Sequence, residues 1–540
     1  MKRRDFVKTT ALGGVTALAH GCSTVQMGSR ALNQPANSGP GFDVHPFIKN
    51  NPGAVFIHLT DVEEKTDQNA LRSIGKELAS ELIVKVPNGG YPLSTRVTVK
   101  PNWTSARPKD GRPVIEKLGV NTDPYFVEGW VQGMKQSGPQ NYFARECCCP
   151  NQWEPMGYSA MCEREGIDLK NLRLPAWELK GDDLNWIDIP DPVVMKRVNY
   201  MAPMNEPDTF LVNIAKMKSH GMGTTASIKN LQGIAGHTFH QMCTAPDQIK
   251  KRYNKYYHKH FTKDHLERVT ALYEKHLAEG YPRWARKEPA SRNGIWMENW
   301  CQRMMDSYSV SPTALNIVEA VYSQDGNGFG IGSHEKLGRD GTTSRDYMSN
   351  MVIFGIDPFR VDLVTHWLAG HEPGNFGLFH IGIERGFSDM LNPHDVPVFV
   401  WKDGMAEPMK LEEFKRTPLV TYYLQRDYDG QEESEFHLCD EPFDYSAWKK
   451  GASLHDCQPN FQVLGKDNDG KMVGQLTVPK KDDVYVDVLD NNGEVQARLR
   501  APDLEPGVHQ VVWDGFASPG IHNYYVKGMG WDDTLKDVIG

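Results

Sequence analysis

The sequence predicts an α/β fold, in which a mostly parallel sheet has helices on both faces, with a helical insertion and a small C-terminal all-β sandwich. Three observations lead to this fold class. Strand-like and helix-like segments alternate along about the first 400 residues. Residues 208–215 form a near-continuous apolar run, which is typical of a strand buried on both faces of a parallel sheet. From residue 484 onward, apolar and polar residues alternate with the period of a half-buried strand.

The elements of the α/β part follow in chain order from apolar pattern and from start and stop signals. Pro101 ends one strand, and Thr122 or Asp123 can cap a helix that starts at Pro124. The expected strands are 54–57, 96–100, 208–215, 315–318 and 351–355, and the expected helices are 69–82, the segment beginning at Pro124, and 358–368.

The insertion, about residues 246–310, is rich in Lys, Arg, Tyr and His and is expected to be mainly helical. His258, His265 and His276 are spaced by seven and eleven residues, so an unbroken helix would place them on one face. Seven residues of helix rise about 10 Å, too far for two such histidines to hold one metal ion. We therefore expect a solvated polar face.

The chain divides into four predicted regions. They are a signal and linker at 1–35, the α/β domain at 45–405, a linker region at 406–464 and a β-sandwich accessory domain at 465–532. In the last region, Asn491-Asn492-Gly493 is a hairpin signal between two alternating runs. This region resembles the immunoglobulin-like (flagellar-hook-cap-type) modules appended to secreted proteins, and we place no chemistry there.

The N-terminus predicts export. Residues 2–8 (KRRDFVK) resemble the twin-arginine signal, and the apolar run at 11–19 is too short to span a bilayer, so no transmembrane segment is expected. Cys22 is a candidate for a lipid anchor. We expect a periplasmic or cell-surface protein.

The composition limits the kinds of partner and cross-link that we expect. Lys and Arg number 60 against 69 Asp and Glu, a net charge of −9, which argues against a chain held as a whole on nucleic acid. Nine cysteines in 540 residues form no disulfide scaffold. The run Cys147-Cys148-Cys149 favours buried thiols or one disulfide, because consecutive residues point in different directions and suit a metal poorly.

The stretch 216–233 (KMKSHGMGTTASIKNLQG) carries most of the functional signal. It follows a buried strand, and ligands of α/β sheets bind at the carboxyl ends of strands. Gly221 and Gly223 allow tight turns, Thr224, Thr225 and Ser227 offer hydroxyls and caps, and the next helix would start with unpaired N–H groups. The stretch therefore predicts a binding site for a carboxylate, phosphate or sulfate group or for an anionic cofactor, while the alternative is an exposed basic loop.

The candidate site residues combine this stretch with the ends of neighbouring strands. His220 can act as a base because its ordinary pKa lies near neutrality. For Asp357 the alternative is structural, since Asp-Pro is a good helix start. The candidates for catalysis are His220, Lys229, Asp357 and Glu319, and those for substrate binding are Lys100, Asn102, Lys216, Lys218, Thr224, Thr225, Asn230 and Asn327. The loops 100–104, 216–230, 325–334 and 355–362 are expected to meet at one edge of the sheet.

Five ordered motifs give the chain a family resemblance over roughly residues 50–400. The motifs are Val97–Asn102, Asn121–Pro124, Ile214–His220 with Ser227–Gly233, Asn316–Ala320 with Asp325–Gly328, and Gly355–Asp362. In this order they resemble domain-of-unknown-function family 362, a resemblance that implies no assigned activity. The loop from His220 to Lys229 is also similar to the loop of lactate racemase in which a lysine anchors a nickel-pincer cofactor.

Three hypotheses stay open. The first is an exported enzyme acting on an anionic small molecule or acidic carbohydrate. The second is a metal- or cofactor-containing oxidoreductase or racemase-like protein, which would use Cys147 to Cys149 or histidines such as His334, His366, His371 and His380. The third is a non-catalytic cell-surface binding protein. The sequence identifies no cofactor, so its identity is unknown.

Overall fold

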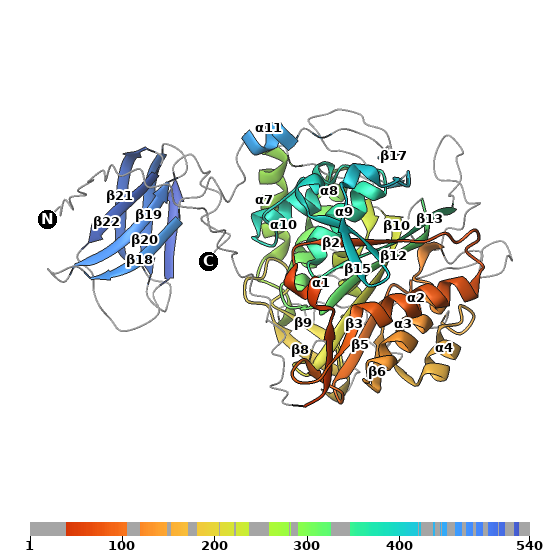
Figure 1. The fold of residues 1–540 in the computed structure, drawn as a ribbon. Coiled ribbons are helices and arrows are strands. Elements are labelled where there is room, and N and C mark those ends of the chain that lie inside the picture. Colours follow the sequence, from red (N-terminus) through yellow and green to blue (C-terminus); the bar gives the residue numbers. More distant parts are fainter. Residues whose placement is uncertain are drawn as a thin grey trace, which may run out of the picture. The chain divides into compact units, whose positions relative to one another are not determined.

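The protein forms two compact units, one ending at Tyr445 and one beginning at Ser446. The computed structural model describes residues 39–104, 119–147, 153–170, 181–204, 206–220, 223–236, 259–279, 281, 290–325, 346–419, 421–422, 436–437, 443, 445–450, 460–466, 471–478, 482–489, 495–505, 507–513 and 523–528. Figure 1 shows the larger unit as a sheet surrounded by helices and the smaller unit as mainly strands.

The larger unit is built on a ten-stranded, mostly parallel sheet, which confirms the predicted fold class. Across the sheet the strands are β15 (Met405–Pro408), β14 (Val398–Lys402), β2 (Val55–Leu59), β13 (Asp346–Gly355), β12 (Leu315–Gln324), β10 (Thr209–His220), β5 (Arg96–Pro101), β6 (Asn141–Arg145) and β7 (Ile167–Lys170), and β11 (Gly223–Thr225) pairs with β10. β13 runs antiparallel to both β12 and β2, and β15 is antiparallel to β14. All ten residues of β12 are buried, as expected for a strand covered on both faces.

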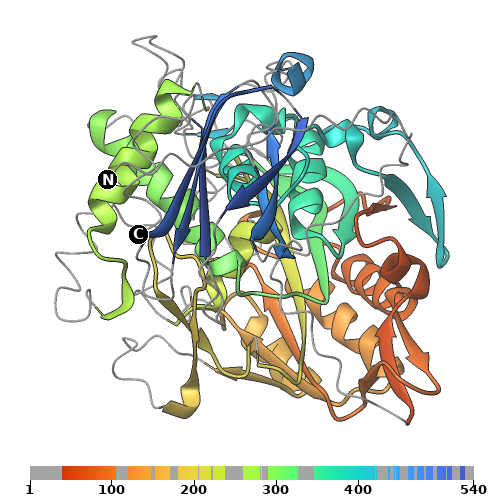
Figure 2. The same cartoon turned by 90° about the vertical axis from the view of Figure 1, so that its left-hand side faces the viewer.

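Helices cover both faces of this sheet (Figures 1 and 2). Apolar side chains of β5 and β10, such as Val97 and Val212, join one core with the first group of helices. This group is α2 (Gln68–Leu82), α3 (Pro124–Gln136) and α4 (Tyr158–Glu165). On the other face lie α5 (Ser227–Leu231), α8 (Ala290–Tyr308), α9 (Pro358–Leu368) and α10 (Gly377–Glu384). Glycine permits the tight crossing of α2 and α3, because a Cβ on Gly129 would lie 1.9 Å from Arg72 O.

Shorter elements complete the larger unit. They are α1 (Pro46–Asn50), α7 (His265–Ala278), the sheet of β3 (Ile83–Val86), β1 (Gly41–Val44) and β4 (Tyr91–Pro92), and the pairs β8 (Leu184–Asp188) with β9 (Arg197–Met201) and β16 (Thr421–Tyr422) with β17 (Phe436–His437). The helix α11 (Tyr445–Lys450) crosses the boundary between the units. None of the helices in the described ranges is both long and apolar enough to cross a bilayer.

Strand order creates a switch point between β5 and β10. From β5 the chain moves outward through β6 to β7, and it then returns to pair β10 on the opposite side of β5 and continues to β12. The connections after β5 and β10 therefore leave in opposite directions, the arrangement at which α/β sheets commonly bind ligands outside the carboxyl ends of the strands. The fold thus favours a ligand site at the ends of β5 and β10.

The described part of the predicted insertion is mainly helical, but the histidines of α7 do not form a solvated face. His265 and His276 on α7 are fully buried, and His258 lies outside the described residues. The prediction is wrong because α7 packs against α8, which leaves this face no access to water. His276 instead contacts two carboxylates, Glu298 of α8 and Glu384 of α10.

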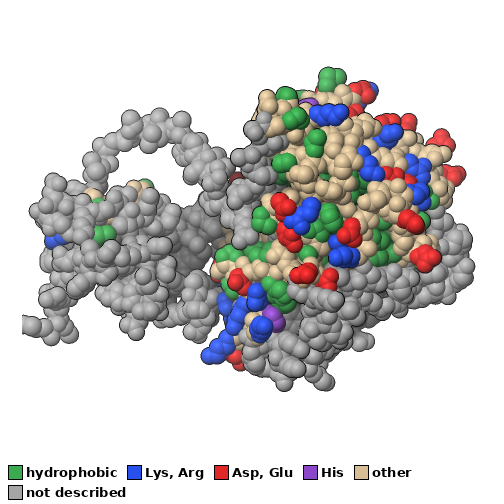
Figure 3. Space-filling view, turned by 90° about the horizontal axis from the view of Figure 1, so that it is seen from below, with side chains coloured by type: hydrophobic (Ala, Val, Ile, Leu, Met, Phe, Trp, Pro, Cys, Tyr) green, Lys and Arg blue, Asp and Glu red, His purple; other side chains and the backbone are tan. Residues whose placement is uncertain are grey.

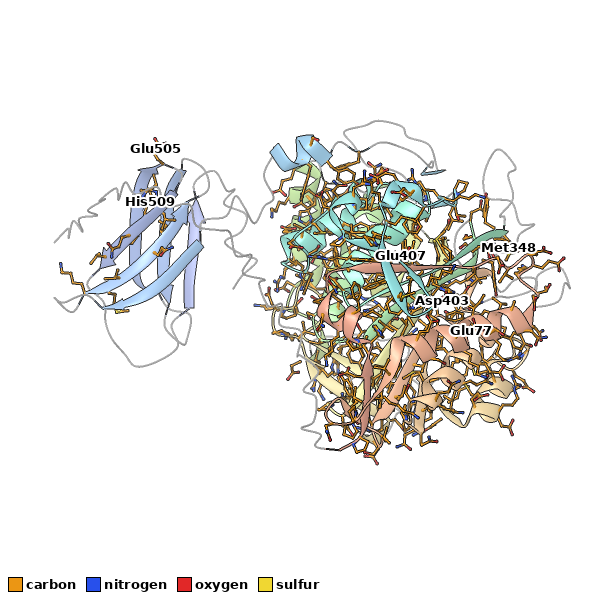
Figure 4. The ribbon with its side chains drawn as sticks, viewed as in Figure 1. Glu77, Met348, Asp403, Glu407, Glu505 and His509 are labelled. Carbon is orange, nitrogen blue, oxygen red and sulfur yellow. The ribbon has the colours of Figure 1, made fainter. Side chains whose placement is uncertain are left out.

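The smaller unit contains two three-stranded antiparallel sheets. One has the order β18 (Asn460–Lys466), β19 (Met472–Val478), β22 (Gly507–Trp513), and the other has the order β21 (Val495–Leu504), β20 (Asp482–Leu489), β23 (Asn523–Gly528). The predicted hairpin at 491–493 lies outside the described residues, although the flanking strands β20 and β21 do pair. Figure 4 shows Glu505 and His509 close together in this unit, where His509 Nε2 lies 2.7 Å from Glu505 O.

Acidic and basic side chains are interspersed on the described surface of the face shown in Figure 3. This mixture agrees with a chain that has 60 basic and 69 acidic residues. Basic side chains that could meet an anionic ligand are found instead inside the protein, at the carboxyl ends of the central strands.

Candidate functional site

Lys100, at the end of β5, is fully buried and its charge is paired. Its Nζ lies 2.6 Å from Glu146 Oε2, and it also donates to Asn230 Oδ1 at 3.0 Å. Glu146 directly follows β6, the neighbouring strand, while Asn230 belongs to α5 on one face of the sheet. The attraction between the carboxylate and the lysine offsets part of the cost of burying both charges.

A second buried pair lies across β10 and β12. Lys216 Nζ is 2.7 Å from Glu319 Oε2, and both side chains are completely buried. The pairing follows from the register, because Lys216 and Glu319 are direct neighbours on parallel strands. Lys216 Nζ also lies 3.3 Å from the centroid of the Tyr322 ring. Tyr322 in turn donates its hydroxyl hydrogen to Asp123 Oδ2 at 2.7 Å.

Burial shifts the pKa values of two members of this cluster toward neutrality. Burial, assisted by the charge of Glu319, raises the pKa of Asp123 to about 6. Burial lowers the pKa of the Lys216 ammonium, although Glu319 opposes the change. One acid and one base with opposite shifts therefore lie within a single hydrogen-bonded cluster.

Lys218, the third lysine, is directed toward the segments that follow β5. It is buried, and its Nζ donates to Asn102 Oδ1 at 3.0 Å and to the carbonyl oxygen of Val120. Asn102 and Thr122 bond each other in both directions, through Asn102 N to Thr122 Oγ1 and Thr122 N to Asn102 O. Lys218 thus lies at the switch point between β5 and β10.

The predicted strand 208–215 is too short, because β10 continues to His220. Lys216 and Lys218 belong to this strand rather than to a loop, and Lys218 pairs with Thr225 of β11. Sequence pattern suggested a loop since charged residues rarely occupy a buried strand. Here Glu319 on the neighbouring strand, and oxygens of Asn102 and Val120, hold the two ammonium groups.

The helix after β11 does bind an anion at its first N–H groups, but the anion is internal. Asp362 of α9 accepts from Ser227 N at 2.6 Å and from Ile228 N at 3.0 Å. The expected unpaired N–H groups are therefore occupied, and the N-cap residue Ala226 makes no side-chain cap. Burial raises the pKa of Asp362 to about 7, against the effect of these two N–H donors.

His366 connects the same helix to the β10–β11 hairpin. Its Nε2 lies 3.2 Å from Thr224 N and its Nδ1 lies 2.8 Å from Asp362 O. Since a backbone N–H can only donate and a carbonyl can only accept, the imidazole is neutral with its hydrogen on Nδ1. His366 therefore acts here as a fixed link between α9 and β11.

Several other candidates make structural contacts. Thr225 Oγ1 donates to Lys216 O at 3.1 Å, and Asn230 Nδ2 donates to Lys100 O at 2.9 Å. Lys229 Nζ lies 5.4 Å from the centroid of the Trp300 ring in α8. Lys229 and Lys218 therefore contact different parts of the protein. The side chain of His220 and the whole of Asn327 lie outside the described residues.

Asp357 lies away from the other candidates. It is the N-cap of α9 and accepts from Phe359 N at 2.8 Å and Arg360 N at 3.2 Å. Because β13 is antiparallel, its last residue, Gly355, pairs with Asn316 at the beginning of β12. The expectation that loop 355–362 meets the other three loops is therefore wrong at 355–357, which lie at the opposite edge of the sheet.

Sequence reasoning missed Glu146 and the titratable role of Asp123. Glu146 follows β6, a strand that was not predicted. The expectation that ligands bind at the carboxyl ends of strands could therefore not point to this residue. Asp123 was considered only as a helix cap. Its Oδ1 does cap α3, but its Oδ2 also accepts a hydrogen bond from the Tyr322 hydroxyl. The motif Asn121–Pro124, which contains Asp123, was the sequence signal that could have identified this residue.

Cysteines and metal ligands give a simpler result. Cys147, Cys162 and Cys301 are buried thiols, and for Cys147 this agrees with the expectation for the run 147–149, of which Cys148 and Cys149 lie outside the described residues. Within the described ranges, no group of three His, Cys, Asp or Glu residues could hold a metal ion.

Comparison with known proteins gives one match. The family model described as Domain of unknown function (DUF362) matches residues 97–366, which is half of the chain. No curated protein and no solved structure matches the chain. The matched region contains both buried lysine–carboxylate pairs and the switch point between β5 and β10.

Proposed function

The chain belongs to the DUF362 family, and we propose that it is an enzyme that binds a small anionic molecule and transfers a proton at the carboxyl ends of β5, β10 and β12. The observation that carries this proposal is the cluster of Lys216, Glu319, Asp123 and Tyr322. Its acid and its base have pKa values shifted toward neutrality from opposite sides. Efficient acid–base catalysis needs groups of this kind.

Stability alone gives a weak reason for these charges. Replacing a buried ion pair with well-packed apolar residues is often neutral or stabilising. The core of this unit is already supplied by apolar side chains on both faces of the sheet. Two buried lysine–carboxylate pairs beside the switch point are therefore better accounted for by chemistry at that edge.

Roles follow from position. Lys218, at the switch point, is suited to contact the negative group of the substrate. The Lys216–Glu319–Asp123 cluster is suited to accept and return a proton, because Tyr322 and the backbone N–H of Asp123 connect its carboxylates. Lys100, whose charge is paired with Glu146, helps to position Asn102, because Lys100 Nζ and Asn102 Nδ2 both donate to Asn230 Oδ1.

Turnover of a panel of anionic compounds would test the proposal. Purified protein is incubated in deuterium oxide with uronates, sugar sulfates and sugar phosphates, and ¹H NMR follows conversion or loss of C–H signals. We expect the native protein to convert at least one compound. Lys216→Met should convert it at a rate lower by a factor of about 100 or more. Lys402→Met, which changes an exposed lysine of β14, serves as the control. Absence of conversion by the native protein across the panel would refute the proposal.

Export and a carbohydrate substrate are parts of the same proposal. Residues 2–8 support export, and a C-terminal unit made of two small sheets is a common companion of glycan-processing domains. Cell fractionation of the native protein and of the double variant Arg3→Lys, Arg4→Lys tests export. Equal amounts of both proteins outside the cytoplasm would contradict the twin-arginine route.

A further inference from the structure

Asn121 has a buried amide donor that no group in the described part of the chain accepts. The residue is fully buried, and its Oδ1 accepts a hydrogen bond from Thr104 N at 2.5 Å. This bond determines the orientation of the amide, because a backbone N–H requires an oxygen acceptor. The Nδ2 group must therefore be the donor end, and it has no acceptor among the described residues. Buried donors without partners are rare and costly, so each one needs an explanation.

The position of Asn121 suggests that explanation. It follows Val120, whose carbonyl oxygen accepts from Lys218 Nζ, and it precedes Thr122, which is bonded to Asn102. Asn102 also accepts from Lys218. Asn121 thus belongs to the segment that touches Lys218 at the switch point, where an α/β sheet binds its ligand.

We propose that Asn121 Nδ2 donates a hydrogen bond to a carboxylate group of the substrate, while Lys218 Nζ binds the same group. This inference rests on the proposed function and specifies its substrate class as a carboxylate-bearing molecule such as a uronate. One ammonium and one amide can each serve one oxygen of a carboxylate. A sulfate or phosphate ester has three terminal oxygens and would leave one without a donor from these two residues. In a buried site both hydrogen bonds are strong, because little water competes for them.

Binding can be tested with defined probes. Isothermal titration calorimetry with the full chain measures the affinity for D-galacturonate, galactose 6-sulfate and galactose. Asn121→Asp keeps an oxygen for Thr104 N, removes the donor and adds a negative charge. We expect galacturonate to bind the native protein most tightly and to lose about 10- to 100-fold in affinity in this variant.

A matched control is offered by Thr98, another fully buried residue, whose Oγ1 has no partner in the described ranges and which lies on the strand that leads to Lys100. Thr98→Val should leave the affinity unchanged within about twofold, because the change removes only an orphaned hydroxyl. Circular dichroism checks that each variant is folded. If Asn121→Asp does not fold, Asn121→Ala supplies the same comparison without the added charge.

The outcomes separate this inference from the proposed function. Equal galacturonate affinity in the native protein and the Asn121 variant would overturn the role of Asn121 and leave the site proposal standing. Equal binding of galactose 6-sulfate and galacturonate would overturn the carboxylate preference. A native protein that binds none of the three probes and converts no anionic compound would overturn the proposed function, and this inference with it.

Discussion

Raising the pH should weaken the attachment of the helical insertion, because His276 is held as a cation between two glutamates. Its Nδ1 lies 3.1 Å from Glu298 Oε1 and its Nε2 lies 2.5 Å from Glu384 Oε2. Burial disfavours the charged ring, but the two carboxylates outweigh this effect and raise the pKa of His276 to about 9. The glutamates come from α8 and α10, so the contact joins α7 to two other helices.

The size of the effect follows from the pKa change. From an ordinary value of 6.5 to about 9, the shift corresponds to about 3 kcal/mol at 1.36 kcal/mol per unit. Because the folded-state pKa is the higher one, this stability is fully present below pH 6.5 and is lost as the pH rises to about 9. His276 and Lys275 lower the pKa of Glu384 to about 2, against the effect of burial. This shift reports largely the same interaction, so its free energy is not added to that of His276.

Urea unfolding of the native protein and His276→Gln at about pH 6, 7.5 and 9.5 measures this contribution to the free energy of unfolding. The difference in the free energy of unfolding between the two proteins should shrink by about 3 kcal/mol across the series. His394→Gln is the control, since His394 and Glu412 also lie 2.8 Å apart but are partly exposed, and such pairs contribute about 1 kcal/mol or less. A difference for His276→Gln that does not change with pH would show that the ring is neutral and would refute the reasoning.

Three further perturbations test the packing and the site. Lys100→Met should cost about 3–5 kcal/mol by leaving Glu146 buried without its cation, and the double variant with Glu146→Gln should recover part of the loss in the same urea assay. Gly129→Ala should lower the melting temperature strongly, because its Cβ would lie 1.9 Å from Arg72 O; an unchanged melting temperature would show that α2 and α3 can separate at little cost. Burial raises the pKa of Asp362 from 3.8 to about 7, so the native protein should lose stability as the pH rises from about 4 to about 8. Asp362→Asn lacks this carboxyl, so its melting temperature should rise relative to that of the native protein over the same range. A constant difference between the two melting temperatures would contradict this.

Local signals were sufficient where a few neighbouring residues control the structure. The helix from Pro124 and the helix 358–368 were predicted from an aspartate followed by proline, and in both cases the aspartate side chain caps the helix. The apolar run at 208–215 identified a central strand because burial on both faces removes polar residues from the pattern. The family motifs likewise indicated the region around the switch point.

Partners distant in the chain decided the rest. The N–H groups of Ser227 and Ile228 bond Asp362, more than a hundred residues away, so no local pattern could show that they are occupied. The antiparallel direction of β13 moved Asp357 to the far edge, since an apolar run carries no information on strand direction.

By itself, the sequence determined the fold class, the family and the position of the main helix starts, because these depend on apolar periodicity and on contacts between near neighbours. Only the tertiary structure decided that three lysines on β5 and β10 are buried and that two of them face carboxylates. It also decided that Asn121, next to a residue that contacts the third lysine, has a donor with no acceptor in the part of the chain that the structure describes. The physical reason is that the energy of a buried charge or amide depends on which groups the fold brings within hydrogen-bond distance.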